Sequence, residues 1–443
     1  MQKNIFWKNP FIILLIFVIA FPVISFADAD KIFKENRKAV VVVIAYDSKG
    51  KPISQGSGFI VRPDGAVVTN YHVISNAVDI KIKAGDKVLK VEGLLHIDKE
   101  NDIAILKAYG KNLPVVRIGD IEKLTVGEKV YVIGSPEGFE NTISDGILSG
   151  IREITDKRKI LQITAPVSRG SSGGALFNKN GEVIGIVTFL IEEAQNLNFA
   201  MPVNLIKNKI SGKKVIALKD SALEDYEKTA EYWFYLGYYY GEAKMHREAL
   251  EAYKQAIRIK PDLAEAHYNL GVAYRKLGMY KEAIKAYKQA IRIKPDLAEA
   301  HYNLGVAYRK LGMYKEAIKA YKQAIRIKPD DADAHYNLGV AYRKLGMNKE
   351  ALEAYKQAIR IKPDDADAHL GLGIAYGSLG MYNEEIEAYK QAIRIKPDFA
   401  YAHYGLGIAY LSLDDRGSAL EQYKILKDLD PERANELFNL IYK

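Results

Sequence analysis

One segment repeats without change in the second half of the chain, and this repeat restricts the fold more than any other feature. The segment AEAHYNLGVAYRKLGMYKEAIKAYKQAIRIKPD occupies residues 264–296 and again residues 298–330. Diverged copies begin at Ala230, Ala332, Ala366 and Ala400, so the period is 34 residues. A fixed period of this length predicts stacked helical units, each of which buries its apolar face only against its neighbours.

The repeat resembles the tetratricopeptide (TPR) family, which has the same period. Small residues let the two antiparallel helices of a unit approach, larger ones fill the space between them, and a proline ends the second helix. The residues at these packing positions in the second copy are Leu270, Gly271, Tyr274, Ala283, Tyr287, Ala290 and Pro295. The resemblance predicts an all-α solenoid of six repeats over residues 230–433, preceded by a linker at residues 211–229 and closed by a capping helix at residues 434–443.

In TPR domains the first helix of each pair lines a concave groove, so the resemblance also predicts a peptide-binding surface. The positions that face this groove in two copies are Tyr268, Asn269, Val272, Arg275, Lys276, Tyr302, Asn303, Val306, Arg309 and Lys310. Tyrosines beside cations suit an extended peptide with acidic side chains or a free carboxylate, although the set matches the family's carboxylate clamp only in part. The alternative is a solvated groove without a dedicated ligand.

The repeats carry most of the basic excess of the chain, whose formal net charge is +9. Acidic residues are interspersed with the basic ones, which is typical of a solvated helix face and argues against nucleic acid as a partner. A histidine recurs in five repeats, but Trp233 takes its place in the first. A position that accepts either residue indicates packing, so we expect no metal there and no cofactor. These histidines are His267, His301, His335, His369 and His403.

The N-terminal segment is basic and then apolar. Lys3 and Lys8 precede the run FIILLIFVIAF (residues 11–21), and Ser25 and Ala27 follow it. This order predicts a signal peptide over residues 1–27 and an exported protein, periplasmic or extracellular; the alternative is an uncleaved membrane anchor that leaves the protein outside the cytoplasm. The sequence has no cysteine, which excludes disulfides, thiolate nucleophiles and cysteine-based zinc sites.

Between Lys38 and Val203, short β-branched runs alternate with glycine, asparagine and aspartate turns, which favours an antiparallel sandwich or barrel. This region also holds the groups that a serine hydrolase needs: a nucleophile, a base and a carboxylate that orients the base. His72 follows one strand, Asp102 precedes another, and RGSSGGAL (residues 169–176) places serines among glycines. His96 with Asp98 and Glu100 could suggest a metal site, but polar residues at a strand end are the simpler interpretation.

The order histidine, aspartate, serine and the segments around it resemble the chymotrypsin-like serine proteases, most closely the HtrA-like branch. The matching segments are GSGFIV, TNYHVI, NDIAILK, GILSGI, SSGGALFN, GEVIGIV and NFAMPVN. The resemblance implies a chymotrypsin-like double β-barrel over residues 28–210, with His72 as general base, Asp102 as its orienting group and Ser172 as nucleophile. It assigns the oxyanion hole to the backbone N–H groups of Gly170 and Ser172. It places the pocket for the residue before the cut at Ala165, Pro166, Val167, Ile186, Val187 and Thr188.

Two features depart from that family. Ser171 precedes the nucleophile where Asn or Asp is common, and a TPR array stands where HtrA-like proteases usually carry PDZ domains. The sequence therefore predicts a multidomain, exported serine endopeptidase whose array holds polypeptide substrates or protein partners. A catalytically inactive chaperone or scaffold, or an adaptor that works through the array, remains the alternative.

Overall fold

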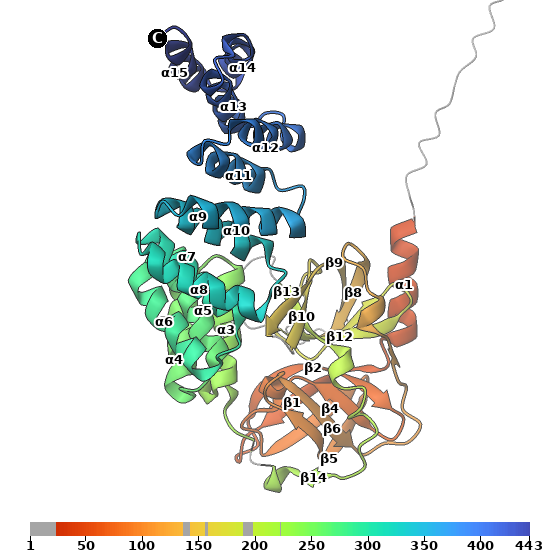
Figure 1. Ribbon diagram of the computed structural model, residues 1–443. Coiled ribbons are helices and arrows are strands. Elements are labelled where there is room, and N and C mark those ends of the chain that lie inside the picture. The colour runs from red at the N-terminus through yellow and green to blue at the C-terminus, as the bar shows by residue number, and fades with distance from the viewer. Residues whose placement is uncertain (1–23, 136–141, 156–157, 189–197, 222) are drawn as a thin grey trace, which may run out of the picture. The chain divides into compact units, whose positions relative to one another are not determined.

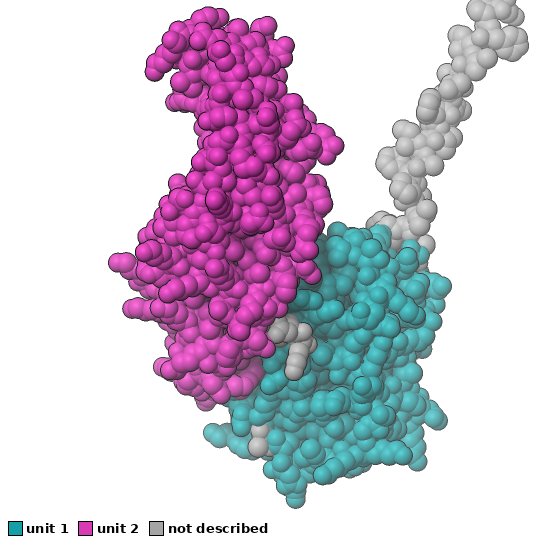
Figure 2. Space-filling view, in the orientation of Figure 1, with its two compact units in different colours: residues 1–226 teal, residues 227–443 magenta. Residues whose placement is uncertain are grey.

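The computed structural model describes residues 24–135, 142–155, 158–188, 198–221 and 223–443. The chain forms two compact units, residues 1–226 and 227–443 (Figure 2). Most of the expected signal peptide lies outside the described residues. Within the described part of the chain, every helix is too short or too polar to span a membrane.

The first unit contains two closed six-stranded β-barrels, as the resemblance predicts (Figure 1). In the first barrel the sheet closes because β5 pairs with both β4 and β6. The strand order is β5-β4-β1-β2-β3-β6, and β14 (Ile216–Ala217) joins β5 from outside. The strands of this barrel are β1 (Val40–Tyr46), β2 (Pro52–Arg62), β3 (Ala66–Thr69), β4 (Asp79–Ala84), β5 (Lys87–Asp98) and β6 (Ile103–Ala108).

The second barrel closes in the same way, through the pairing of β11 with both β8 and β12. Its order is β11-β8-β9-β10-β13-β12, and the short β7 (Arg117–Ile118) runs parallel to β12. The strands of this barrel are β8 (Lys129–Gly134), β9 (Thr142–Thr155), β10 (Arg158–Ile163), β11 (Ala175–Asn178), β12 (Glu182–Thr188) and β13 (Asn198–Pro202).

Short helical elements complete the first unit. Helix α1 (Ile24–Asn36) buries Ile32 near Gly181 of the second barrel, and the four-residue α2 (Tyr71–Ile74) follows β3. The 3-10 turns are η1 (Ile121–Lys123), η3 (Val203–Leu205), η4 (Leu218–Asp220) and η5 (Tyr226–Lys228). The residues expected as a linker, 211–229, therefore contribute β14 to the first barrel, and the first unit extends to Tyr226. Pairing of this segment with a strand could not be read from its sequence.

The second unit is a run of thirteen helices over the described residues 230–441, consistent with the predicted TPR solenoid. The first helices of the six pairs are α3 (Ala230–Glu242), α5 (Ala264–Lys276), α7 (Ala298–Lys310), α9 (Ala332–Lys344), α11 (Ala366–Ser378) and α13 (Ala400–Ser412). The second helices are α4 (His246–Ile259), α6 (Tyr280–Ile293), α8 (Tyr314–Ile327), α10 (Asn348–Ile361), α12 (Tyr382–Ile395) and α14 (Arg416–Leu429). The final helix, α15 (Pro431–Ile441), starts before the position expected for the cap.

The contact between the two helices of a repeat depends on a glycine against a tyrosine ring. A Cβ atom on Gly271 would lie 2.5 Å from Cε1 of Tyr287, which is too close for any side chain. The same relation joins Gly305 with Tyr321 and Gly339 with Tyr355. The close approach lets each fully buried tyrosine fill the space between the helices.

The recurring histidines have a structural contact in each repeat. Nε2 of His267 lies 2.9 Å from the carbonyl oxygen of Pro261, six residues earlier, and Nε2 of His301 lies 3.0 Å from that of Pro295. His335, His369 and His403 repeat this contact. Each imidazole thus holds the loop that enters its helix.

The fifth repeat carries a buried acid that the other repeats lack. Glu385 is 7% exposed and stands where the preceding repeats have alanine, such as Ala351. Its carboxyl occupies space beside Gly377, where a Cβ atom would lie 2.4 Å from Oε1. Burial raises the pKa of Glu385 to about 7, and hydrogen bonding from Tyr389 opposes the shift.

This pKa predicts that the array loses stability as the pH rises. An acid with a raised folded-state pKa holds its proton in the fold while the unfolded chain has released it, so stability falls between about pH 4.5 and pH 7. We expect Glu385→Ala to raise the free energy of unfolding by about 1–2 kcal/mol at pH 8 and to flatten its pH dependence. Urea unfolding at pH 5 and pH 8 measures both effects.

The neighbouring Glu384 is exposed, so Glu384→Ala serves as the matched control. Its pH dependence should equal that of the unmodified protein. A Glu385→Ala variant that keeps the original pH dependence would contradict the assignment.

Candidate active site

His72 lies on the short helix α2, directly after β3 of the first barrel. Its neighbours Tyr71 and Val73 are buried, whereas the His72 side chain keeps 21% of its surface exposed. Packing of the two flanking residues fixes the helix and leaves the imidazole at the surface of the barrel. The side chain is therefore held in place and still accessible.

Asp102 stands immediately before β6 and has no exposed surface. Its Oδ2 atom lies 2.7 Å from Nδ1 of His72, and its Oδ1 accepts a hydrogen bond of 2.9 Å from the backbone N–H of the same residue. Thr188 of the second barrel donates its hydroxyl to Oδ2 at 3.3 Å. A buried carboxylate requires such donors, and here they fix the orientation of the imidazole.

The backbone of Asp102 is also held in an unusual conformation. Its φ angle is +53°, which non-glycine residues rarely adopt. The carbonyl oxygen of Asp102 accepts hydrogen bonds from the backbone N–H of Tyr71 at 3.1 Å and from Nδ2 of Asn70 at 2.8 Å. The segment that carries His72 thus binds both the side-chain carboxylate and the backbone carbonyl of Asp102.

Ser172 lies in the glycine-rich turn that precedes β11 of the second barrel and is 5% exposed. Gly170 and Gly173 on either side have φ angles of +88° and +84°, which favour glycine. Ser57 of the first barrel binds this turn twice: its N–H donates to the carbonyl of Ser172 at 2.7 Å, and its hydroxyl donates to the carbonyl of Gly170 at 2.6 Å. The two barrels are therefore joined at the turn.

The contacts of Gly173 bring the turn against the segment that leads to His72. A Cβ atom on Gly173 would lie 2.1 Å from the carbonyl oxygen of Ser57, 2.4 Å from Oγ1 of Thr69 and 3.1 Å from the backbone N of Asn70. Gly56 approaches the same place, since its Cβ would lie 2.9 Å from the carbonyl oxygen of Ser172. The residues expected as base, orienting group and nucleophile thus gather where the barrels meet.

The expected pocket residues lie on two segments of the second barrel. Val187 exchanges backbone hydrogen bonds with the glycine-rich turn, donating to the carbonyl of Gly174 and accepting from Gly173. Asn198 donates its side chain to the carbonyl of Ala165 at 2.9 Å, and Ser144 donates to that of Pro166 at 2.7 Å. Val167 follows Pro166, and Ile186 is fully buried.

Several contacts in this region were not predicted from the sequence. Ser57 lies in the segment GSGFIV, but the sequence does not indicate that it binds the turn of Ser172. Thr188 is expected in the pocket, and in the structure its hydroxyl donates a hydrogen bond to Asp102. The alternative at His96 receives no support from its neighbours: Asp98 accepts two hydrogen bonds from Asn101, and Glu100 accepts one from Arg158 at 2.8 Å. Within the described ranges, His, Asp and Glu side chains form no cluster suited to a metal ion.

Some of the residues expected to line the groove form hydrogen bonds within the array itself. Nδ2 of Asn303 donates to the hydroxyl of Tyr268 at 3.2 Å, and Asn337 repeats this contact with Tyr302. Burial raises the pKa of Tyr268 to about 12. Tyr287 also has a raised pKa because of burial, and the nearby Arg275 opposes the shift.

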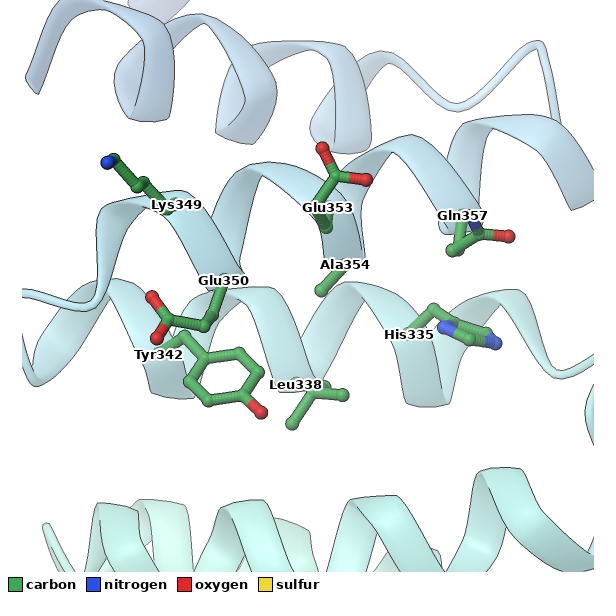
Figure 3. A pocket seen from close by; sticks show the side chains of 8 residues that line it. All are labelled: His335, Leu338, Tyr342, Lys349, Glu350, Glu353, Ala354 and Gln357. Atoms are coloured by element: carbon green, nitrogen blue, oxygen red, sulfur yellow. The ribbon is translucent and has the colours of Figure 1, made fainter. Parts of the chain in front are cut away.

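The remaining positions of the predicted groove differ in exposure. Lys276 and Lys310 are exposed, whereas Asn269, Val272, Val306 and Arg309 are half-buried. The described surface of the array also has a cavity of about 410 Å³ between α9 and α10, which none of the predicted groove residues lines (Figure 3). Leu338, Tyr342 and Ala354 supply apolar surface there, and Glu350 and Glu353 supply charge. A cavity of about 380 Å³ lies at the equivalent residues of the next repeat.

Two closed antiparallel barrels, with a histidine–aspartate pair on one and a glycine-rich serine turn on the other, define a chymotrypsin-like fold. Residues 56–186 match the family described as the trypsin-like peptidase domain. Five segments between residues 246 and 414 match the TPR repeat. The chain therefore combines a trypsin-like peptidase domain that has HtrA-type relatives with C-terminal TPR repeats, as the sequence indicated.

Three relatives each match less than half of this chain. A protein of Pseudomonas putida named "Probable periplasmic serine endoprotease DegP-like" is 40% identical over 165 residues, which are 36% of this chain and 34% of that protein. The anti-sigma-I factor RsgI9 of Acetivibrio thermocellus is 35% identical over 171 residues, which are 38% of this chain and 24% of that protein. A crystal structure of the serine endoprotease from Yersinia pestis has 31% identity and a TM-score of 0.37, and the match covers 41% of this chain and 64% of that one. This chain thus spans about a third of the length of the first of these relatives.

The contacts of Gly173 predict a large effect of a single methyl group. Gly173→Ala would place Cβ against the backbone of Ser57 in addition to the cost of a positive φ angle, so we expect a loss of more than about 2 kcal/mol in the free energy of unfolding. Gly127→Ala is the matched control, because Gly127 has a φ of +94° and its Cβ would meet nothing within 4 Å. Urea unfolding followed by circular dichroism measures both; equal losses would contradict the close approach.

Proposed function

We propose that the protein is an exported serine endopeptidase that cleaves polypeptides through Ser172, His72 and Asp102. The contact of 2.7 Å between Nδ1 of His72 and Oδ2 of the buried Asp102 supports this proposal most directly. It leaves Nε2 of the imidazole as the nitrogen that takes a proton. The similarity to the trypsin-like peptidase domain and to periplasmic endoproteases adds to this argument.

The proposed reaction is acyl transfer in two steps. Nε2 of His72 removes the hydroxyl proton of Ser172 as Oγ attacks the carbonyl carbon of the substrate, and the resulting imidazolium then protonates the leaving amine. Water, deprotonated by the same nitrogen, hydrolyses the acyl ester and regenerates the hydroxyl. Asp102 keeps the proton on Nδ1 and stabilises the imidazolium while it is charged.

The negative charge that develops on the substrate carbonyl oxygen needs donors that are already in place. We assign this role to the backbone N–H groups of Gly170 and Ser172. Glycine at position 170 supports the assignment, because its φ of +88° strains other residues and its lack of a side chain leaves the amide accessible. The hydrogen bonds from Ser57 hold the carbonyl groups of the same two residues and so help to fix the backbone of this turn.

We further propose that the TPR array recruits substrates or protein partners. The repeats are the kind of unit that binds extended peptides on the first helix of each pair. Because Asn303 and Arg275 make contacts within the array, the exposed Lys276 and Lys310 are the better candidates for pairing with acidic groups of a ligand. A nucleic-acid partner is not part of the proposal, and membrane attachment would require an uncleaved signal segment.

The central test is Ser172→Ala in the mature full-length protein. Loss of the nucleophile should lower kcat for casein or a peptide substrate at least about 10,000-fold, because the remaining groups cannot form the acyl ester. The adjacent Ser171→Ala is the matched control, and we expect it to keep most of the activity. Hydrolysis at equal rates by the unmodified protein and Ser172→Ala would exclude the proposed mechanism and favour a chaperone or adaptor.

The pocket residues predict the preferred residue before the cut. Ala165, Val187 and their neighbours include no carboxylate, so a bound lysine or arginine would lose water without gaining an ion pair. We expect kcat/KM for peptides with alanine or valine at this position to exceed that for lysine or arginine by about a hundredfold. A peptide library with these four residues measures the ratio; preferred cleavage after lysine or arginine would refute the assignment of the pocket.

A further inference from the structure

The last residues of the first unit lie against the helix that carries His72. The ring of Tyr226 is stacked on the imidazole of His72, with centroids 6.3 Å apart and planes at 25°. The same ring meets Tyr71 edge-on, with centroids 5.6 Å apart and planes at 74°. Tyr226 follows the second barrel by more than twenty residues, so neither barrel needs it to close its sheet.

Two further contacts attach this segment, residues 223–226, which we call the strap. The hydroxyl of Tyr71 donates to the carbonyl oxygen of Glu224 at 3.1 Å. The Glu224 carboxylate lies 2.9 Å from Nζ of Lys99, and that ammonium group is 5.6 Å from the centroid of the Tyr71 ring. Lys99 stands three residues before Asp102, so the strap is attached both to the segment of His72 and to the turn that leads to Asp102.

The stacked ring supplies a constraint that Asp102 does not. A hydrogen bond at Nδ1 fixes one edge of the imidazole but lets the ring rock about that bond, and Nε2 at the opposite edge moves most. The ring of Tyr226, whose plane is 25° from that of the imidazole, resists this motion, because rocking would disturb the offset stacked contact.

We propose that Tyr226 is a positioning residue for His72: the strap holds the imidazole plane so that Nε2 is aimed at the nucleophile. This inference rests on the proposed function of His72 as general base. It adds to that function a residue outside both barrels, three positions before Thr229, the N-cap of the first TPR helix. The effect acts on proton transfer and should appear in kcat rather than in KM.

The test compares Tyr226→Leu with Tyr226→Phe in the full-length protein. Tyr226→Leu removes the ring, and we expect kcat for a short peptide to fall about tenfold with KM within about twofold. Tyr226→Phe keeps the ring and should retain kcat within about threefold, because the argument depends on the ring face rather than on the hydroxyl. The low-field proton resonance of the His72 Nδ1–H, which reports the hydrogen bond to Asp102, should broaden in Tyr226→Leu and remain in Tyr226→Phe.

Tyr109→Leu is the matched control. Tyr109 is exposed and follows β6, whereas Asp102 precedes it, so the six-residue strand separates them by about 20 Å. This variant should leave kcat and the resonance unchanged. If Tyr226→Leu is unfolded at the assay temperature, Tyr226→Met, with a flexible side chain that fills the space, takes its place.

Three results would overturn the proposal: an unchanged kcat in Tyr226→Leu, a rise in KM alone, or equal losses in Tyr226→Leu and Tyr226→Phe. Failure of the proposed function gives a different result, because the unmodified protein and Ser172→Ala would then hydrolyse the peptide equally. In that case the resonance decides the matter, since it reports the position of the imidazole without any turnover. An identical resonance in Tyr226→Leu and the unmodified protein would then reject the role of Tyr226.

Discussion

The arrangement of the first unit depends on how one buried carboxylate is satisfied. Asp102 has no exposed surface, so each of its oxygens needs a donor. The donors come from α2 through His72 and from β12 through Thr188. The hydrogen bonds to the Asp102 carboxylate therefore hold α2 of the first barrel against β12 of the second. The carbonyl oxygen of Asp102 also accepts hydrogen bonds from Tyr71 and Asn70, so both the backbone and the side chain of this residue hold the segment that carries His72.

The architecture could be predicted from the sequence because its signals are local. Strand runs separated by turn residues indicated an antiparallel sandwich or barrel, and the resemblance to the HtrA-like proteases implied the double barrel. The 34-residue period indicated paired helices, and the structure confirms the barrels and the helices. His72, Asp102 and the turn of Ser172 could be found because each lies in a short segment with a recognisable pattern. A sequence pattern does not contain the distance between two segments. The contact of 2.7 Å between His72 and Asp102 is therefore known only from the structure.

The missed features share a different property, which is that they depend on residues far apart in the chain. Ser57 and Gly170 are 113 positions apart, and Tyr71 and Glu224 are 153 apart. The groove of the array shows the same limit of prediction from sequence, although the residues concerned are closer together in the chain. The sequence places Tyr268 and Asn303 on the first helices of two repeats, but only the fold shows that they bind each other. A position in a repeat can be assigned from its period, whereas its partner depends on the next repeat.

The identical pair of repeats has a consequence for how such an array can change. Residues 264–296 and 298–330 have the same sequence, so each copy offers the same surface to the unit that follows it. Removing one copy, or inserting a third, would recreate a junction that already exists, because each unit contacts only its neighbours. The array is thus built to gain or lose length in whole repeats, while the barrels and their junction stay as they are.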